Sequence, residues 1–390
     1  MTKQRIQSVD ILRGAIMIIM ALDHTRDFFY NSGGVNPMNL AVTTPVFFFT
    51  RWITHYCAPN FVFLSGISIY LAGTCRTKSQ LSGFLVKRGL WLIAFEVIFI
   101  SFAITLNPTY NVIVLQVIWA IGFSMIILAL LTRAPIAVTA IIGAVIFFGH
   151  NLLDLVKSPQ TGFGNVLNTL FFNAFGSTFP IGHGRVILDL YAVIPWAGVM
   201  MLGYVFGTLY KPSYDGQKRR KILLITGLST VALYIILRFI NAYGDPTPWT
   251  VQRNPVFTML SFLNTRKNPP SLMYLCMTIG PALIVLALAE KVQNKFAAIL
   301  TTFGSVPFFY YALHIYLIRG LNVVVFFLLG YKTSQIVNPN SISLFNPDNF
   351  GFSLPVAYLL WLAVVTALYF PCRWFSRYKK THKQWWLSYL

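Results

Sequence analysis

Acidic residues are scarce in this sequence. Its 390 residues include 10 Asp and Glu against 30 Lys and Arg, and these four types make up only 10% of the chain. Soluble domains have roughly 25% charged residues, whereas here 56% of the residues are hydrophobic and the mean hydropathy is +0.65. The chain therefore lacks the polar surface that soluble globular domains need. Its formal charge of +20 would indicate nucleic-acid binding in a soluble protein, so the positions of the cations relative to the apolar runs must be known before the charge is interpreted.

Motifs of several common protein classes are also missing. The sequence has no P-loop GxxxxGK[ST], no GxSxG and no HExxH, which argues against ATP-driven transport, serine hydrolysis and zincin proteolysis. Cysteines are few and have no CxxC spacing, so we expect packing residues, with neither a disulfide nor a metal site. The four are Cys57, Cys75, Cys276 and Cys372.

Long apolar runs occupy most of the chain. A transmembrane helix needs about 20 mainly apolar residues, and about ten such runs are present. They lie near residues 11–30, 45–72, 84–106, 111–131, 135–156, 187–210, 221–241, 270–290, 302–330 and 354–372. The turn-forming residues 107–110 between the third and fourth runs predict a tight helical hairpin. The predicted fold is therefore an all-α integral membrane bundle of about ten transmembrane helices.

The cations are unevenly distributed between alternate ends of these runs. With the N-terminus in the cytoplasm, 20 of the 30 Lys and Arg fall on the cytoplasmic side, as the positive-inside rule requires. An even number of spans then places both termini in the cytoplasm. The excess charge is thus interpreted as a topology signal of a multi-pass cell-membrane protein, and no nucleic-acid partner is needed to explain it.

The two ends of the chain carry local signals. Lys3 and Arg5 precede an apolar stretch, as in a signal peptide, but Asp10 interrupts its start and no small-x-small cleavage site follows. We therefore expect an uncleaved first helix. Residues 1–372 are expected to form the transmembrane domain, and residues 373–390 a basic, Trp-containing cytoplasmic tail on the inner leaflet.

The first apolar run contains ionisable residues, which usually face a bundle interior or a water-filled cavity. Arg13 and His24 are eleven residues apart; on a helix they project within about 20° of each other and about 16 Å apart along the axis. Asp27 lies one turn beyond His24 and could orient it, whereas Asp23 lies about 100° away and could face another neighbour. The plainer interpretation is that Arg13 snorkels to lipid headgroups and that His24 is a hydrogen-bonded interface histidine.

The second run adds polar residues at its outer end. Arg51 and His55 are expected to lie near His24 if the first two helices are neighbours. Asn60 follows a proline that can release backbone carbonyls. The small residues at 65, 66 and 68 favour close helix packing over a chemical role.

Three more polar residues occur in later runs. Glu96 lies near the middle of the third run and needs either a salt-bridge partner or a proton. His314 lies near mid-membrane, where a structural hydrogen-bonding histidine is the more common case. Asp189 at the outer start of the sixth run could line an outer vestibule.

Four segments in chain order resemble the bacterial relatives of heparan-α-glucosaminide N-acetyltransferase, within the integral-membrane acyltransferases. They are Ser8–Gly14 followed by His24, Pro195–Tyr204, Lys267–Gly280 and Phe303–His314. The spacing of Arg13 and His24 is also similar to that in bacterial sugar O-acetyltransferases. The resemblance implies a bundle that takes an acetyl group from cytosolic acetyl-CoA and delivers it across the membrane to a sugar hydroxyl or amine. One departure is that His24 stands where the eukaryotic glucosaminide enzymes have Asn, and residues 25–54 contain no His to match their loop histidine.

Combining the resemblance with the residue pattern predicts a reaction site. His24 would act as general base, Asp27 would orient it, and Arg51 or Asn60 would stabilise the oxyanion. An acetyl-His intermediate and direct transfer both stay open. The expected contacts to the CoA phosphates are Arg13, Arg76, Lys87 and Arg88. The expected acceptor-binding residues are His55, Asp189 and His314.

A rival hypothesis is a secondary transporter or exporter of an anionic solute, since Arg13, Arg238, Arg319 and Glu96 would fit a binding or proton-relay pathway. No inverted repeat supports it. The expected partners of the acyltransferase are the lipid bilayer, acetyl-CoA and a sugar or glycan acceptor, with no nucleic acid and no metal. A homodimer is compatible with the sequence, which leaves the oligomeric state open.

Overall fold

The computed structural model describes residues 6–156, 162–174, 176–382 and 384–388. Within these, eight helical segments are long and apolar enough to cross a membrane. They are Pro45–Gly73, Lys78–Thr105, Ile136–Leu155, Val193–Tyr210, Gly216–Ile240, Leu272–Ala289, Pro307–Leu328 and Leu354–Thr381. The mostly helical architecture is thus confirmed, while the count of ten spans and the cytoplasmic side of the termini stay predictions.

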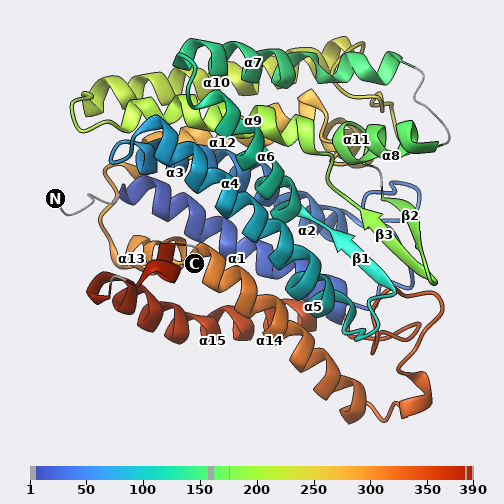
Figure 1. The fold of residues 1–390 in the computed structure, drawn as a ribbon. Helices are drawn as coiled ribbons and strands as arrows, with labels where there is room; N and C mark the ends of the chain where they lie inside the picture. Colours follow the sequence, from blue (N-terminus) through green and yellow to red (C-terminus); the bar gives the residue numbers. More distant parts are fainter. Residues whose placement is uncertain (1–5, 157–161, 175, 383, 389–390) are drawn as a thin grey trace.

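The helices follow the predicted runs closely (Figure 1). The α-helices are α1 (Gln7–Phe29), α2 (Pro45–Thr54), α3 (Cys57–Gly73), α4 (Lys78–Phe95), α5 (Ser101–Thr105), α6 (Val117–Leu131), α7 (Ile136–Gly149), α8 (Gly162–Phe171), α9 (Val193–Phe206), α10 (Gly216–Ile240), α11 (Pro255–Leu263), α12 (Leu272–Ala289), α13 (Lys295–Gly304), α14 (Pro307–Leu328) and α15 (Leu354–Thr381). A π-helical turn, Glu96–Ile100, joins α4 to α5, and 3₁₀ turns occupy His150–Leu155, Gly207–Tyr210, Thr333–Gln335 and Trp385–Ser388.

Two predicted runs are each divided into two helices. The run 45–72 breaks between α2 and α3, and the run 302–330 breaks between α13 and α14. Pro307 is at the first turn of α14, where its missing N–H costs no helical hydrogen bond. At the start of α2 the Thr44 side chain accepts a hydrogen bond from the Phe47 N–H, which caps that helix.

A three-stranded sheet corrects the all-α prediction. β1 (Val112–Leu115) pairs in parallel with β3 (Arg185–Asp189), and β3 pairs antiparallel with β2 (Ser177–Gly182). The starts of the runs at 111 and 187 are therefore strands, and the helices begin only at Val117 and Val193. Short β-branched runs fit a strand as well as a buried helix, so their apolar character alone could not distinguish the two.

The start of α1 and the end of α15 lie at one end of the bundle, which we call the terminal end (Figure 1). The sheet lies at the other, which we call the sheet end. The predicted tail beginning at 373 has no separate fold at its start, since α15 continues to Thr381. The predicted cytoplasmic cations Lys3, Arg5 and Lys383 lie outside the described residues.

Glycine contacts bring α1 close to its neighbours. A Cβ added to Gly14 would lie 1.9 Å from the Leu300 carbonyl oxygen of α13, and one added to Gly304 would lie 1.9 Å from the Asp10 carbonyl oxygen. Only glycine permits backbones to approach so closely. This packing fixes the first half of α1 against α13.

Candidate active site

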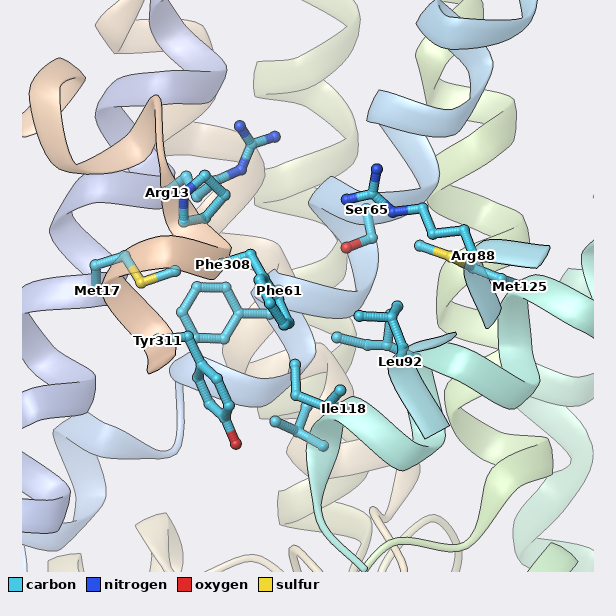
Figure 2. Close-up of a pocket in the computed structure, with 13 residues that line it drawn as sticks. Arg13, Met17, Phe61, Ser65, Arg88, Leu92, Ile118, Met125, Phe308 and Tyr311 are labelled. Atoms are coloured by element: carbon cyan, nitrogen blue, oxygen red, sulfur yellow. The ribbon is translucent and has the colours of Figure 1, made fainter. Parts of the chain in front are cut away.

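A cavity of about 90 Å³ lies beside α1 and receives Arg13 from α1 and Arg88 from α4 (Figure 2). Arg13 donates to Ser68 Oγ at 2.7 Å and to the Gly304 carbonyl at 3.1 Å. It also forms an ion pair with Asp10, and its side chain is 15% exposed. Arg13 is therefore turned into the bundle, contrary to the alternative that it snorkels to lipid headgroups.

A second cavity of about 200 Å³ surrounds the other end of the same helix face. His24, Asp23 and Asp27 enter it from α1, and Arg51 enters it from α2. The segments between the helices complete its wall with Gln116, Leu190, Tyr191, Lys267 and Asn268. Of the two residues that were expected near His24, Arg51 lines the same cavity and His55 does not.

The two cavities share three wall residues, Phe61, Val117 and Tyr311. The two cavities therefore adjoin one another along α1 across these three side chains, and we call the pair the passage. The guanidinium groups of Arg13 and Arg88 lie at one end of the first cavity, and the Tyr311 hydroxyl is directed toward the other (Figure 2). One end of the passage is thus cationic, and the other contains an imidazole, carboxylates and a lysine.

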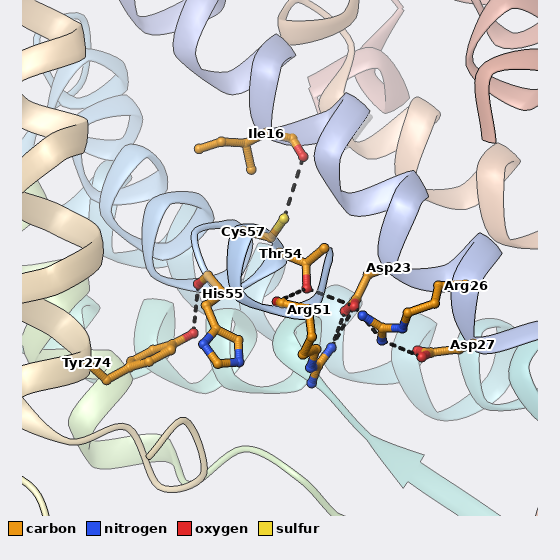
Figure 3. A network of polar contacts seen from close by, with 9 residues as sticks. All are labelled: Ile16, Asp23, Arg26, Asp27, Arg51, Thr54, His55, Cys57 and Tyr274. Atoms are coloured by element: carbon orange, nitrogen blue, oxygen red, sulfur yellow. Dashed lines mark hydrogen bonds and ion pairs between the residues drawn. The ribbon is translucent and has the colours of Figure 1, made fainter. Parts of the chain in front are cut away.

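Asp23 is the centre of the charged network in the second cavity (Figure 3). Its carboxylate contacts Arg51 at 2.6 Å, Arg26 at 2.7 Å and the Thr54 hydroxyl at 2.8 Å. Asp27 forms an ion pair with Arg26, and its side chain is 48% exposed. The structure therefore places Arg26 against the Asp27 carboxylate that was expected to orient His24.

His24 instead contacts a residue of α14. The rings of His24 and His314 have their centroids 5.2 Å apart. His314 is fully buried, and its Nδ1 lies 2.6 Å from the Tyr311 carbonyl oxygen. The buried structural histidine expected at 314 thus lies directly against the candidate base.

Two titratable groups at the sheet end have shifted pKa values. Burial, followed by the nearby charge of Arg51, lowers the pKa of Lys267 to about 8. Burial raises the pKa of Asp189 to about 7, although its carboxylate accepts a hydrogen bond from the Tyr191 N–H. Asp189 ends β3 and positions the segment that contributes Leu190 and Tyr191 to the cavity.

Other predicted site residues lie outside both cavities. Asn60 is buried and donates to the Tyr56 carbonyl at 2.7 Å. His55 is buried against Tyr274, with ring centroids 5.4 Å apart. Neither residue is among those that line the two cavities. Glu96 accepts a hydrogen bond from the Gln116 N–H at 2.8 Å, so it is linked to the cavity wall through the backbone.

The predicted phosphate-binding cations are divided among three environments. Arg88 lines the first cavity, whereas its neighbour Lys87 is exposed. Arg76 lines a separate cavity of about 330 Å³ at the terminal end, together with Lys78 and Lys211. Arg76 and Arg88 nevertheless approach the same Phe84 ring, with their guanidinium carbons 4.5 and 5.9 Å from its centroid.

The sequence interpretation missed three residues of the passage. No role at the reaction site was predicted for Lys267, Tyr191 or Tyr311. Both Lys267 and Tyr311 occur within segments that carry the family resemblance, which was the only signal available for them. Their contribution depends on loops and helices that meet α1 only in the folded chain.

Residues 5–239 match the family described as "Heparan-alpha-glucosaminide N-acetyltransferase, catalytic". This match covers more than half of the chain. The chain belongs to this family. Membership of this family, together with the apolar helices, indicates a membrane acetyltransferase. The matched residues include Arg13, His24, Arg51 and Arg88. Lys267 and His314 lie beyond the matched residues. No curated protein sequence matches the chain significantly.

No metal site accompanies these residues within the described ranges, where no three His, Cys, Asp or Glu side chains form a group suited to an ion. All four cysteines are unpaired. Cys57 lines the second cavity and donates weakly to the Ile16 carbonyl at 3.7 Å. The polar groups that line the passage are imidazole, carboxylate, guanidinium, amine, phenol, thiol, hydroxyl and amide groups.

Proposed function

We propose that the protein transfers an acetyl group from acetyl-CoA, bound from the cytosolic side, to a hydroxyl or amine of a sugar or glycan on the outer side of the membrane. The observation that carries this proposal is the pair of cavities that meet at Phe61, Val117 and Tyr311. A passage along one helix allows a thioester and an acceptor to approach from opposite ends.

Acetyl-CoA would enter at the terminal end of the bundle. The CoA phosphates would bind near Arg13 and Arg88, since guanidinium groups form strong charge-assisted hydrogen bonds to phosphate. Arg76 lies close to Arg88 through the shared Phe84 ring and could extend this cationic surface. The pantetheine arm would then occupy the largely apolar wall formed by Met17, Leu92, Ile118, Ile121, Met125 and Phe308.

His24 would act as the general base. In direct transfer, one imidazole nitrogen removes the proton from the acceptor hydroxyl or amine as the acceptor oxygen or nitrogen attacks the thioester carbonyl. The tetrahedral intermediate then expels the CoA thiolate, which recovers that proton from His24. In this proposal the two substrates occupy the adjoining cavities at the same time, so the acetyl group is transferred directly and no acetyl-His intermediate forms.

The developing oxyanion needs a cation or hydrogen-bond donor in the cavity. Arg51 lines the cavity but is already paired with Asp23. Asn60 does not line it, so Lys267 replaces Asn60 as the candidate stabiliser. Its ammonium group lies 5.6 Å from the Tyr191 ring centroid, and burial strengthens its interaction with a negative charge.

The test uses purified protein in proteoliposomes that contain a trapped panel of amino and neutral sugars. Acetyl-labelled acetyl-CoA is added outside, and acetylated sugar is measured inside by mass spectrometry. The wild-type protein should acetylate a trapped sugar, and His24→Gln should reduce the rate by about 10²- to 10⁴-fold, as expected for a lost general base. The His24→Gln protein should bind acetyl-CoA with the affinity of the wild type.

Two results would contradict the proposal. Uptake of a solute without thioester cleavage would support the transporter hypothesis. A stable acetyl-His24 adduct formed with acetyl-CoA alone would replace direct transfer by a two-step reaction.

A further inference from the structure

His314 has one ring nitrogen bound and the other buried without a partner. Its Nδ1 faces the carbonyl oxygens of Tyr311 at 2.6 Å and Tyr310 at 3.2 Å. A carbonyl accepts hydrogen bonds only, so Nδ1 must carry the proton and Nε2 must be the acceptor. Nε2 is buried and makes no hydrogen bond to any residue that the structure describes. An unpartnered buried acceptor destabilises the folded protein and calls for an explanation, and a donor that reaches it during the reaction cycle provides one.

His24 is the neighbour that can supply this donor. Its ring is tilted by 51° to that of His314, with 5.2 Å between the centroids. A general base normally has a third group that holds its second nitrogen. The adjacent carboxylates are already engaged, since Asp23 contacts Arg51, Arg26 and Thr54, and Asp27 contacts Arg26.

We infer that His314 is a positioning residue for His24. When His24 takes the acceptor proton on one nitrogen, its other nitrogen donates a hydrogen bond to His314 Nε2. His314 keeps its own proton on the Tyr311 carbonyl throughout, so it orients and stabilises the imidazolium without gaining a charge. Catalytic hydrogen bonds are often long or misaligned before substrate binds, which agrees with two rings in contact but without this bond.

The Tyr311 residue links this arrangement to the passage. Its carbonyl fixes the His314 tautomer, while its side chain lines both cavities. Substrate at the junction therefore contacts the same residue that sets the orientation of His314. Charged and titratable groups that share the cavity with His24 come from six parts of the chain: Asp23 and Asp27 of α1, Arg51 of α2, Cys57 of α3, Tyr191 from the segment before α9, Lys267 from the segment before α12, and Tyr311 of α14.

This inference rests on the proposed function, so its experiment starts with full-length protein that is active in the proteoliposome assay. His314→Phe removes the acceptor and keeps a ring, whereas His314→Gln retains an acceptor oxygen at a similar reach. We expect His314→Phe to lower kcat on the order of 10- to 100-fold, since orientation is part of the contribution of a general base. The KM for acetyl-CoA should change less than about twofold, and His314→Gln should recover most of kcat.

The pH profile separates positioning from packing. Without an acceptor for its second N–H, the His24 imidazolium is harder to form. The acid limb of kcat/KM should therefore move to lower pH in His314→Phe, by about one unit, but not in His314→Gln.

Three outcomes would overturn either the proposed function or the positioning role of His314. If His24→Gln remains fully active, His24 is not the base and the proposed function loses its mechanism. If His24→Gln is inactive while His314→Phe has the wild-type kcat and pH profile, only the positioning role is wrong. If His314→Phe and His314→Gln lose kcat and thermal stability equally, His314 serves packing alone.

Discussion

Asp23 on α1 and Arg51 on α2 are bound closely enough to fix the two helices at the second cavity. Arg51 Nη1 lies 2.6 Å from both carboxylate oxygens, and the two side chains are only 15% and 21% exposed. Asp23→Asn should destabilise the protein by about 1–3 kcal/mol, because it leaves a partly buried guanidinium without its counter-charge. Apparent thermal midpoints in detergent measure this effect. Asp27→Asn is the comparison, since its more exposed carboxylate should contribute less than about 1 kcal/mol; an equal loss in both variants would refute the assignment.

The contact between α1 and α13 predicts a strong difference between two glycine substitutions. Gly14→Ala would place its Cβ 1.9 Å from the Leu300 carbonyl oxygen, so the helices must separate. We expect a loss of about 1–3 kcal/mol, together with weaker acetyl-CoA binding as Gly304 moves away from Arg13. Gly83→Ala on α4 is the matched control, because no atom lies within 4 Å of its added Cβ. It should be neutral or stabilise the protein by up to about 1 kcal/mol.

Asp189 should make stability depend on pH. Burial raises its pKa in the folded protein from 3.8 to about 7, so the folded state retains a proton that the unfolded chain loses. Asp189 therefore lowers the free energy of unfolding by about 2–4 kcal/mol as pH rises from about 4 to 7. Above pH 7 its effect on the free energy of unfolding is constant. Asp189→Asn keeps an acceptor for the Tyr191 N–H and should remove the effect. Between pH 4 and 8 the thermal midpoint of the wild type should fall relative to that of Asp189→Asn. If the two midpoints change with pH in the same way, burial does not raise the pKa of Asp189.

Lys267 should affect the alkaline side of the activity profile. Its pKa of about 8 means that the ammonium charge is lost as pH rises through that value. If this charge stabilises the oxyanion, wild-type kcat should decline above pH 8, and Lys267→Arg should stay active to higher pH because guanidinium remains protonated. Lys267→Met should lower kcat by about 10²- to 10³-fold below pH 8, and the difference from the wild type should shrink at higher pH, where the wild-type ammonium charge is also lost. The same alkaline decline in the wild type and Lys267→Arg would show that another group titrates.

Adjacent cations on α4 should differ in their effect on acetyl-CoA affinity. Arg88 lines the first cavity, whereas Lys87 is exposed. Arg88→Gln should weaken binding by about 10- to 100-fold, as expected for a lost charge-assisted hydrogen bond, and Lys87→Gln by less than about threefold. Calorimetric titration of acetyl-CoA into detergent-solubilised protein measures both. Equal weakening would mean that the phosphates bind the outer surface of α4 as well.

The positions of most helices could be predicted because about 20 consecutive apolar residues are a local property of the chain. The strands could not, since β1 pairs with a strand more than 60 residues later and each contains only a few apolar residues. The breaks before α3 and α14 were also missed, because an apolar run continues across each interruption of the helix.

The sequence by itself determined that this is a helical membrane protein and that Arg13 and His24 lie on one face of the first helix. Hydropathy and the helical repeat are enough for both conclusions, since each depends on residues close together in the chain. Only the tertiary structure decided that Arg51 is paired with Asp23, that Lys267 enters the cavity and that His314 lies against His24. These contacts join segments from distant parts of the chain, and their geometry depends on how closely the helices pack at residues such as Gly14 and Gly304.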